Sequence, residues 1–219
     1  MNKNNPISEL ASPGRRLGAF FIDQTVLGFA NIIAALVIFG TQSQALNTLG
    51  TKFIAFSEAN STVDGSQIEG KLNELMSSPE VVSALGALIL PFASWILVSL
   101  LLAAIYYIGL TARSGQTLGK KLLRIKVVGS SETNPTILQS AERYFLYVGL
   151  STLSSVLAVM ELLVYRTLDI PNTALSTVHS ILDFIIFALF FVGALMIVTR
   201  SDRRGYHDIS ADTKVVKTT

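Results

Sequence analysis

The sequence has no cysteine and only two histidines among its 219 residues. The missing thiols exclude disulfides, cysteine nucleophiles and thiolate metal sites, and two histidines leave little for a zinc site. Charged residues make up 15% of the chain, whereas a soluble domain usually has about 25%. The net charge of +2 is too small to indicate nucleic acid binding. We therefore expect no metal, no cofactor and no nucleic acid partner.

Half of the residues are apolar, and many of them gather in four stretches that are almost free of charge. A helix that crosses a membrane needs roughly 20 mostly apolar residues. We therefore predict an all-α membrane protein, a four-helix transmembrane bundle in a single domain over residues 1–219, with the lipid bilayer as its first partner. The predicted helices lie near 17–40, 84–110, 144–165 and 177–199.

Lysine and arginine are unevenly divided among the segments that flank these stretches. Fourteen of the 17 lie in the N-terminal segment, in the segment between the second and third stretches, and in the tail. Because cytoplasmic loops carry the excess of positive charge, both termini are predicted to be cytoplasmic. Residues 41–83 then form a long external loop. A short amphipathic helix is predicted inside it from apolar residues at helical spacing: Ile68, Leu72, Leu75 and Met76.

Two short segments on the predicted cytoplasmic side have the pattern of strands. Leu123, Ile125 and Val127 alternate with basic residues, and 212–217 is a similar stretch. We expect the two segments to pair, antiparallel, into a small two-strand element that holds the tail beneath the helices.

The sequence contains no recognisable enzyme motif. Gly115–Lys121 is similar to a phosphate loop, but three residues separate its glycines where four are required. A zinc-protease His-Glu-x-x-His and a Gly-x-Ser-x-Gly are both missing. We therefore predict that the protein is not an enzyme.

Asp23 is the most informative charged residue, because it lies about two turns into the first apolar stretch. A carboxylate at the centre of a membrane helix costs about 2.5–3.5 kcal/mol on insertion scales, so it needs a partner or water. Arg16 lies seven residues earlier on the same helical face and is the expected partner. Two interpretations stay open: a buried ion pair or hydrogen-bond network that fixes helix packing, and a site for an ion or a proton.

A second polar group is predicted toward the outer side of the membrane. Glu161 is near the outer end of the third predicted span, and His179 and Asp183 are one turn apart on the fourth. An acid–histidine pair at membrane depth is able to relay protons. The alternative is an interfacial cluster wetted by external water.

Three motifs, in the right order, resemble the RDD family of small bacterial and archaeal membrane proteins, which is named after one arginine and two aspartates. Pro13–Asp23 is similar to the family's first helix, Gly115–Val128 to the segment after its second helix, and Arg204–Thr213 to its closing motif. The chain departs from the family where a Gly-Thr pair usually precedes the last strand, because Asp212 stands before Thr213 here.

The resemblance implies a multi-pass protein of the prokaryotic cytoplasmic membrane, in a family suggested to transport unidentified ligands. It also implies that Asp208 is the second aspartate and that Arg143 opens the third helix. We expect a polar network of Arg16, Asp23, Arg143 and Asp208, in which two carboxylates balance two guanidinium groups.

Two functions stay open on this basis. One is transport of an ion or a small solute, with Asp23 as the coupling site. Four helices enclose little volume, so such a transporter is expected to form a homo-oligomer or to join another membrane protein. The other is a non-transport scaffold that anchors or assembles a partner complex. Solvent access to Asp23 separates the two.

Overall fold

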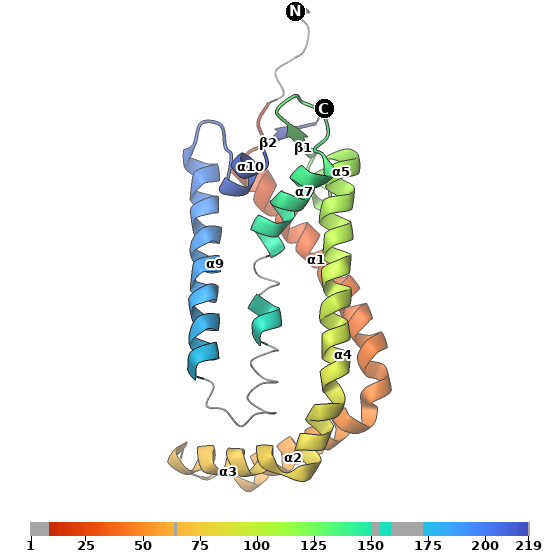
Figure 1. The fold of residues 1–219 in the computed structure, drawn as a ribbon, viewed down its shortest axis with the longest axis vertical. Coiled ribbons are helices and arrows are strands. Elements are labelled where there is room, and N and C mark those ends of the chain that lie inside the picture. Colours follow the sequence, from red (N-terminus) through yellow and green to blue (C-terminus); the bar gives the residue numbers. More distant parts are fainter. Residues whose placement is uncertain (1–8, 64, 150–153, 159–172, 219) are drawn as a thin grey trace, which may run out of the picture. The chain divides into compact units, whose positions relative to one another are not determined.

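The computed structural model describes residues 9–63, 65–149, 154–158 and 173–218. This part of the chain is mostly helical and includes a sheet of two strands (Figure 1). The chain divides into two compact units. One unit consists of Met1–Phe29 with Leu100–Thr219, and the other of Ala30–Ser99.

Among the described residues, three helical segments are long and apolar enough to span a membrane. The first contains α1 (Pro13–Phe39), η1 (Gly40–Gln42) and α2 (Ser43–Ala59). The second contains α4 (Pro79–Ala104), the π-helix η2 (Ile105–Gly109) and α5 (Leu110–Ser114). The third is formed by α9 (Thr173–Thr199). They confirm the helices predicted near 17–40, 84–110 and 177–199, and each begins a few residues earlier than predicted.

Half of the span predicted at 144–165 lies outside the described residues. Before it, α7 (Ile137–Tyr144) runs into the π-helix η3 (Phe145–Gly149), and residues 154–158 are helical. The four-helix bundle therefore stays a prediction.

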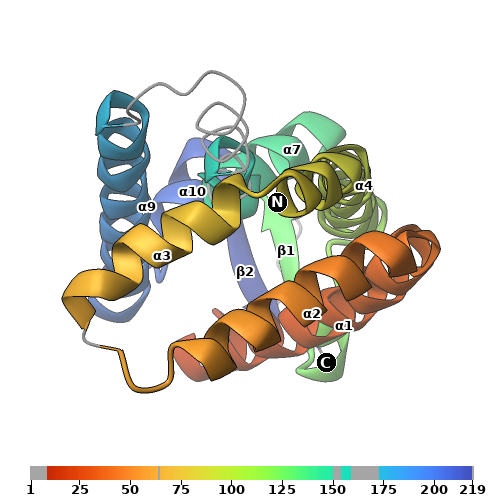
Figure 2. The ribbon, with the colours of Figure 1, turned by 90° about the horizontal axis from the view of Figure 1, so that it is seen from below.

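Residues 41–83 contain more helix than a loop prediction implies. The amphipathic helix predicted there is confirmed as α3 (Gly65–Ser77), and α2 precedes it along the chain (Figure 2). In α2 the larger apolar residues recur every three or four positions, which favours a helix despite many polar neighbours: Leu46, Leu49, Phe53 and Phe56.

Aromatic side chains hold α1 and α4 together within the unit Ala30–Ser99. The ring of Phe39 lies 4.9 Å from that of Phe92 and 6.5 Å from that of Trp95, both edge-on. The indole Nε1 of Trp95 donates a hydrogen bond of 3.3 Å to the carbonyl of Asn31. These edge-on contacts are the arrangement that aromatic rings prefer.

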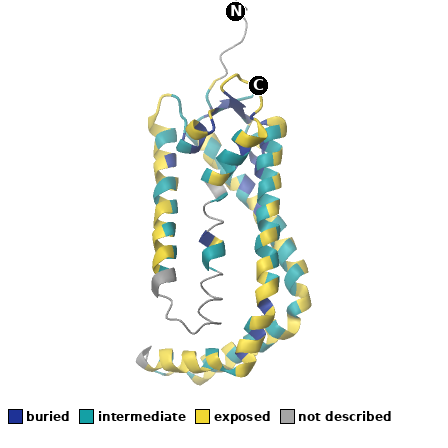
Figure 3. Ribbon diagram, in the orientation of Figure 1, coloured by how far each residue is buried: buried dark blue, intermediate teal, exposed yellow. Residues whose placement is uncertain are grey.

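The sheet pairs β1 (Ile125–Gly129) with β2 (Thr213–Lys217) in antiparallel register, with Val127 opposite Val215. This confirms the predicted pairing of the two segments. The N-terminal segment joins the same sheet, because the amide of Ala11 donates to the carbonyl of Val215 at 3.0 Å. Figure 3 shows that burial is concentrated here, whereas α4 and α9 are largely exposed or half-buried, as expected of helices that meet lipid.

A glycine makes the sharp turn at the end of α5, and an aspartate makes the one just before β2. Gly115 has φ +72°, and a Cβ there would meet the carbonyl oxygen of Val127 at 2.4 Å. The short helix α6 (Leu118–Leu122) then precedes β1. Asp212 has φ +46° just before β2. Glycine adopts this conformation freely and aspartate tolerates it better than most residues, which explains how the chain departs from the family's Gly-Thr pair.

Candidate functional site

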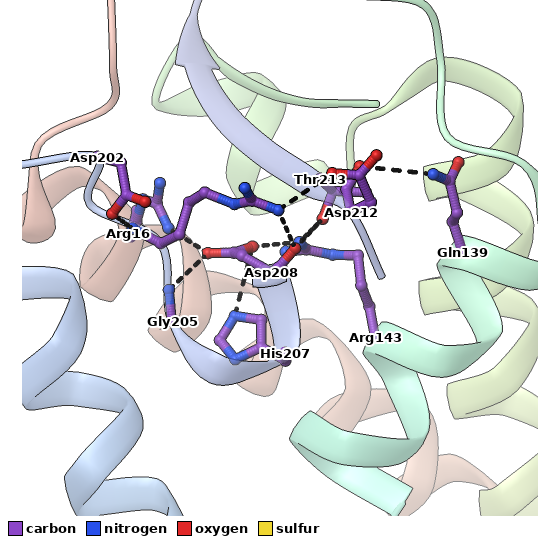
Figure 4. A network of polar contacts seen from close by, with 10 residues as sticks. Arg16, Gln139, Arg143, Asp202, Gly205, His207, Asp208, Asp212 and Thr213 are labelled. Atoms are coloured by element: carbon purple, nitrogen blue, oxygen red, sulfur yellow. Dashed lines mark hydrogen bonds and ion pairs between the residues drawn. The ribbon is translucent and has the colours of Figure 1, made fainter. Parts of the chain in front are cut away.

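Asp208 lies in the first turn of α10 (Tyr206–Ser210) and is 0% exposed. Nη1 of Arg16 donates to its Oδ2 at 2.7 Å, and Nη1 of Arg143 donates to its Oδ1 (Figure 4). The amide of Gly205 also donates to Oδ2, at 3.1 Å. The carboxylate therefore ties α1 and α7 to α10, and the tail brings Asp208 against both arginines of the predicted network.

The surroundings of Asp208 and His207 decide which of these two side chains is charged at neutral pH. Burial alone would raise the pKa of Asp208, but the guanidinium groups of Arg143 and Arg16 outweigh it and hold that pKa below its usual range. Nε2 of His207 lies 3.6 Å from Oδ1 of Asp208. Burial, opposed by Asp208, lowers the pKa of His207 to about 4. At neutral pH the histidine is therefore uncharged and the aspartate is ionised.

Asp23 is 1% exposed and is bound by residues of η2 and α6 rather than by Arg16. The hydroxyl of Tyr106 donates to Oδ1 at 2.6 Å, and the amide of Gly119 donates to the same oxygen at 2.8 Å. The hydroxyl of Thr117 donates to Oδ2 at 2.6 Å. Nζ of Lys120 lies 4.0 Å from Oδ2.

The predicted pair of Arg16 with Asp23 is therefore wrong, since Arg16 pairs with Asp208. Two residues seven positions apart on a helix share a face, but the rise along the axis separates them by about 10 Å. Each side chain then meets the residues that other elements bring to its own level. The fold places Asp208 beside Arg16 and the N-terminal end of α6 beside Asp23.

Close approach of α6 to α1 makes this arrangement possible. A Cβ on Gly119 would lie 2.2 Å from the carbonyl oxygen of Ala19 and 2.9 Å from Oδ1 of Asp23, so a larger residue does not fit. The π-helix η2 carries both tyrosines of the site: Tyr106 bonds to Asp23, and the ring of Tyr107 lies 5.9 Å from Nζ of Lys120. Such π-helical turns often occur at functional sites.

Arg16, Asp23 and Arg143 line one cavity of about 80 Å³, together with Lys120 and Ser140. Three members of the predicted network therefore face the same space, and Asp208 contacts both of its arginines. Burial lowers the pKa of Lys120 to about 8, and this effect is opposed by Asp23. The cavity thus carries positive charge on its wall and is able to change that charge near neutral pH.

Sequence reasoning missed several residues of this site. The sequence patterns gave no role to Tyr106 and Tyr107, and they placed Thr117, Gly119 and Lys120 in a segment that does not fit a phosphate loop. The available signal was the position of that glycine-rich segment directly after an apolar span that ends in adjacent tyrosines.

The outer polar group is only partly described. Nε2 of His179 lies 3.5 Å from Oδ2 of Asp183, and the hydroxyl of Ser154 contacts both side chains. Glu161 lies outside the described residues. Within the described part of the chain, no group of three histidine, aspartate or glutamate side chains is arranged to hold a metal ion.

The family model described as "RDD family" matches residues 10–212. This range contains the whole site, from Arg16 on α1 to Asp208 on α10. No curated protein and no solved structure is similar enough to the chain to count as a match. Because the family match covers well over half of the sequence, the chain belongs to the RDD family.

Proposed function

We propose that the protein transports an ion or a small solute across the cell membrane, with Asp23 as the coupling site. The observation that carries this proposal is the position of Asp23 on the wall of the cavity that Arg16, Lys120 and Arg143 also line. A carboxylate in an apolar span is costly, and such residues commonly mark ion and proton pathways. In this proposal the polar residues bind and exchange charge, and none of them catalyses a reaction.

Lys120 gives Asp23 a partner whose charge changes under physiological conditions. Its Nζ lies 4.0 Å from the carboxylate, and burial lowers its pKa to about 8. When the lysine loses its proton, the cavity loses one positive charge, and the groups that donate hydrogen bonds to the carboxylate are all neutral. This supports transport that depends on pH.

We further propose a multi-pass topology with four spans and both termini in the cytoplasm. Residues 144–165 form the third span in this topology. The distribution of 14 of the 17 lysines and arginines supports it. A reporter fused after Thr219 is expected to read cytoplasmic, and one inserted near Ser61 is expected to read external. If both report the same side, the four-span topology is wrong.

A second function, a scaffold that anchors a membrane-protein partner or a second copy of the chain, is favoured by the hydrogen bonding of Asp23. The hydroxyls of Tyr106 and Thr117 and the amide of Gly119 already give the carboxylate three hydrogen bonds within the protein. In a scaffold these bonds would serve only to fix α6 against α1.

Flux into proteoliposomes separates the two functions. A pH-sensitive dye inside the vesicles reports proton movement after gradients of inorganic salts are imposed on wild type, Asp23→Asn and Asp202→Asn. The last variant is the matched control, because its carboxylate is partly exposed and pairs with Arg200 at 2.9 Å outside the cavity. We expect flux that depends on pH in wild type and in the control.

The same flux is expected to disappear in Asp23→Asn at equal protein levels. Undiminished flux through a well-folded Asp23→Asn protein would remove Asp23 from the mechanism. No flux in wild type under any gradient would favour the scaffold instead.

A further inference from the structure

We infer that the cavity lined by Arg16, Ser140, Arg143 and Lys120 binds one small oxyanion, namely a phosphate or carboxylate group. This inference rests on the proposed function for the identity of the cavity and adds the class of ligand. Binding at equilibrium is nevertheless a separate property from flux and is measured separately.

Positive charge is in excess around this cavity. Among the described residues, Arg16, Arg143 and Lys120 on the wall are balanced by Asp23 on the wall and by Asp208 behind the arginines. One of the three positive charges therefore has no counter-ion among these residues. His207, also on the wall, adds no charge at neutral pH because burial lowers its pKa to about 4. A buried excess charge is costly unless it is paired, so an anion is the ligand that the cavity favours.

Donors without partners are the second observation. Within the described part of the chain, Nε and Nη2 of Arg16 and the hydroxyl of Ser140 are buried and make no hydrogen bond. The Arg16 side chain is 10% exposed and Ser140 is 2% exposed, and both line the cavity. Leaving such groups unpaired is costly, because each loses its hydrogen bonds to water and gains none in the protein.

The arrangement of these donors suits an oxyanion. Nε and Nη2 form one edge of the guanidinium group, which matches two oxygens of a phosphate or carboxylate, while Nη1 of Arg16 is used by Asp208. Ser140 and Arg143 lie three residues apart on α7 and therefore face the same side. Asp23 does not compete for these donors, because it is bound by Tyr106, Thr117 and Gly119.

The volume limits the size of the ligand. A buried water needs about 10–15 Å³ of cavity volume. A cavity of about 80 Å³ therefore holds a group as large as several waters. A single oxyanion fits this size, whereas a nucleotide does not.

The oxyanion has two sources, free in solution or in a lipid headgroup. The lipid source is relevant because an apolar groove between α1 and α9, of about 210 Å³, shares Arg16 and His207 with the cavity. Phe20 and Ile197 also line both spaces. A headgroup at Arg16 would therefore have room for an acyl chain beside it.

Two measurements on the full chain separate these sources. Calorimetric titration with sodium phosphate, against sodium chloride at equal ionic strength, in a zwitterionic detergent tests the free ion. Thermal unfolding in phosphatidylcholine nanodiscs with and without phosphatidic acid tests the headgroup. A response to phosphate assigns a free oxyanion, a response to phosphatidic acid alone assigns a headgroup, and either supports the inference.

Ser140→Ala is the deciding variant, with the exposed Ser131→Ala as its control. Ser140→Ala is expected to weaken binding about tenfold while the unfolding midpoint without ligand stays equal or rises, because the deleted hydroxyl has no partner. Ser131→Ala is expected to change neither. No response in either arm, or unchanged binding in Ser140→Ala, overturns the inference. Oxyanion binding without flux would overturn transport alone, and flux without oxyanion binding would overturn the oxyanion site alone.

Discussion

Asp23 and Asp208 are both buried carboxylates, and their surroundings differ in kind. Asp208 is held by the charged guanidinium groups of Arg16 and Arg143. Asp23 is held by hydroxyl groups and a backbone amide, with Lys120 at the limit of an ion pair. Removing the charge of Asp208 strands two cations, whereas removing the charge of Asp23 strands only Lys120. Charged groups therefore hold one carboxylate and mainly neutral donors hold the other, which in the proposed function is the one that exchanges charge.

The largest effect is expected for Asp208→Asn. The change leaves Arg16 and Arg143 without their anion in a buried site, and breaking such a pair typically costs about 3–5 kcal/mol. Chemical unfolding in detergent and abundance in membranes should both show the loss. Asp202→Asn, at a partly exposed carboxylate, should change stability by less than about 0.5 kcal/mol. Equal stability of Asp208→Asn and wild type would show that the charges do not fasten the helices.

Gly119→Ala is expected to have the next largest effect. The new Cβ would lie 2.2 Å from the carbonyl oxygen of Ala19, so α6 must move away from α1 and the amide bond to Asp23 must lengthen. Overpacking of this kind costs about 1–3 kcal/mol. Gly28→Ala is the control, because a Cβ there meets nothing within 4 Å. In helix α1 that change should be neutral or should add up to about 1 kcal/mol of unfolding free energy.

Asp23→Asn should destabilise less than Asp208→Asn, by about 1–2 kcal/mol. The amide oxygen still accepts from Tyr106 and Gly119, while the bond from Thr117 must rearrange and Lys120 loses its carboxylate. Unfolding of the two variants under the same conditions measures the difference. A loss for Asp23→Asn as large as that for Asp208→Asn would end the distinction between the two carboxylates.

The smallest effect concerns Lys120 and pH. Burial lowers the pKa of Lys120 from 10.5 to about 8, so between these values the folded state holds fewer protons than the unfolded state. Stability from this group therefore rises with pH, by about 1 kcal/mol between pH 8 and 9. The charged groups that face its amine are Asp23, Asp208, Arg16 and Arg143.

Substitution of Lys120 tests whether this residue causes the rise in unfolding free energy with pH. Lys120→Met should remove the rise in unfolding free energy between pH 8 and 9, and the exposed Lys121→Met should keep it. A slope that survives in Lys120→Met would assign the pH dependence to another group.

Patterns that are local in the sequence could be predicted from it. Each signal lies within one segment: the apolar runs of α1, α4 and α9, and the alternating residues of β1. The partner of β1 could be predicted because few segments on the predicted cytoplasmic side have the pattern of a strand. The helix α2 was not predicted, because its polar residues are typical of a loop and its apolar spacing is modest.

Residues of the site could be predicted on two grounds, a charge within an apolar stretch or a place in a family motif. Asp23 stands out in an apolar stretch, and Arg143 and Asp208 were named through the family motifs. Tyr106 and Gly119 are ordinary residues in their own segments. They become partners of Asp23 only when α6 packs against α1, a long-range contact that spacing along the chain does not encode.

The bond between Arg16 and Asp208 can form only late in synthesis. The two residues are 192 positions apart, whereas Arg143 and Asp208 are 65 apart. A ribosome adds about 5–20 residues per second, so the guanidinium group of Arg16 waits roughly 10–40 s after its own translation for its counter-ion. Until then the guanidinium group of Arg16 has no Asp208 to pair with. The buried ion pair that ties α1 to α10 is therefore among the last contacts that the growing chain is able to make.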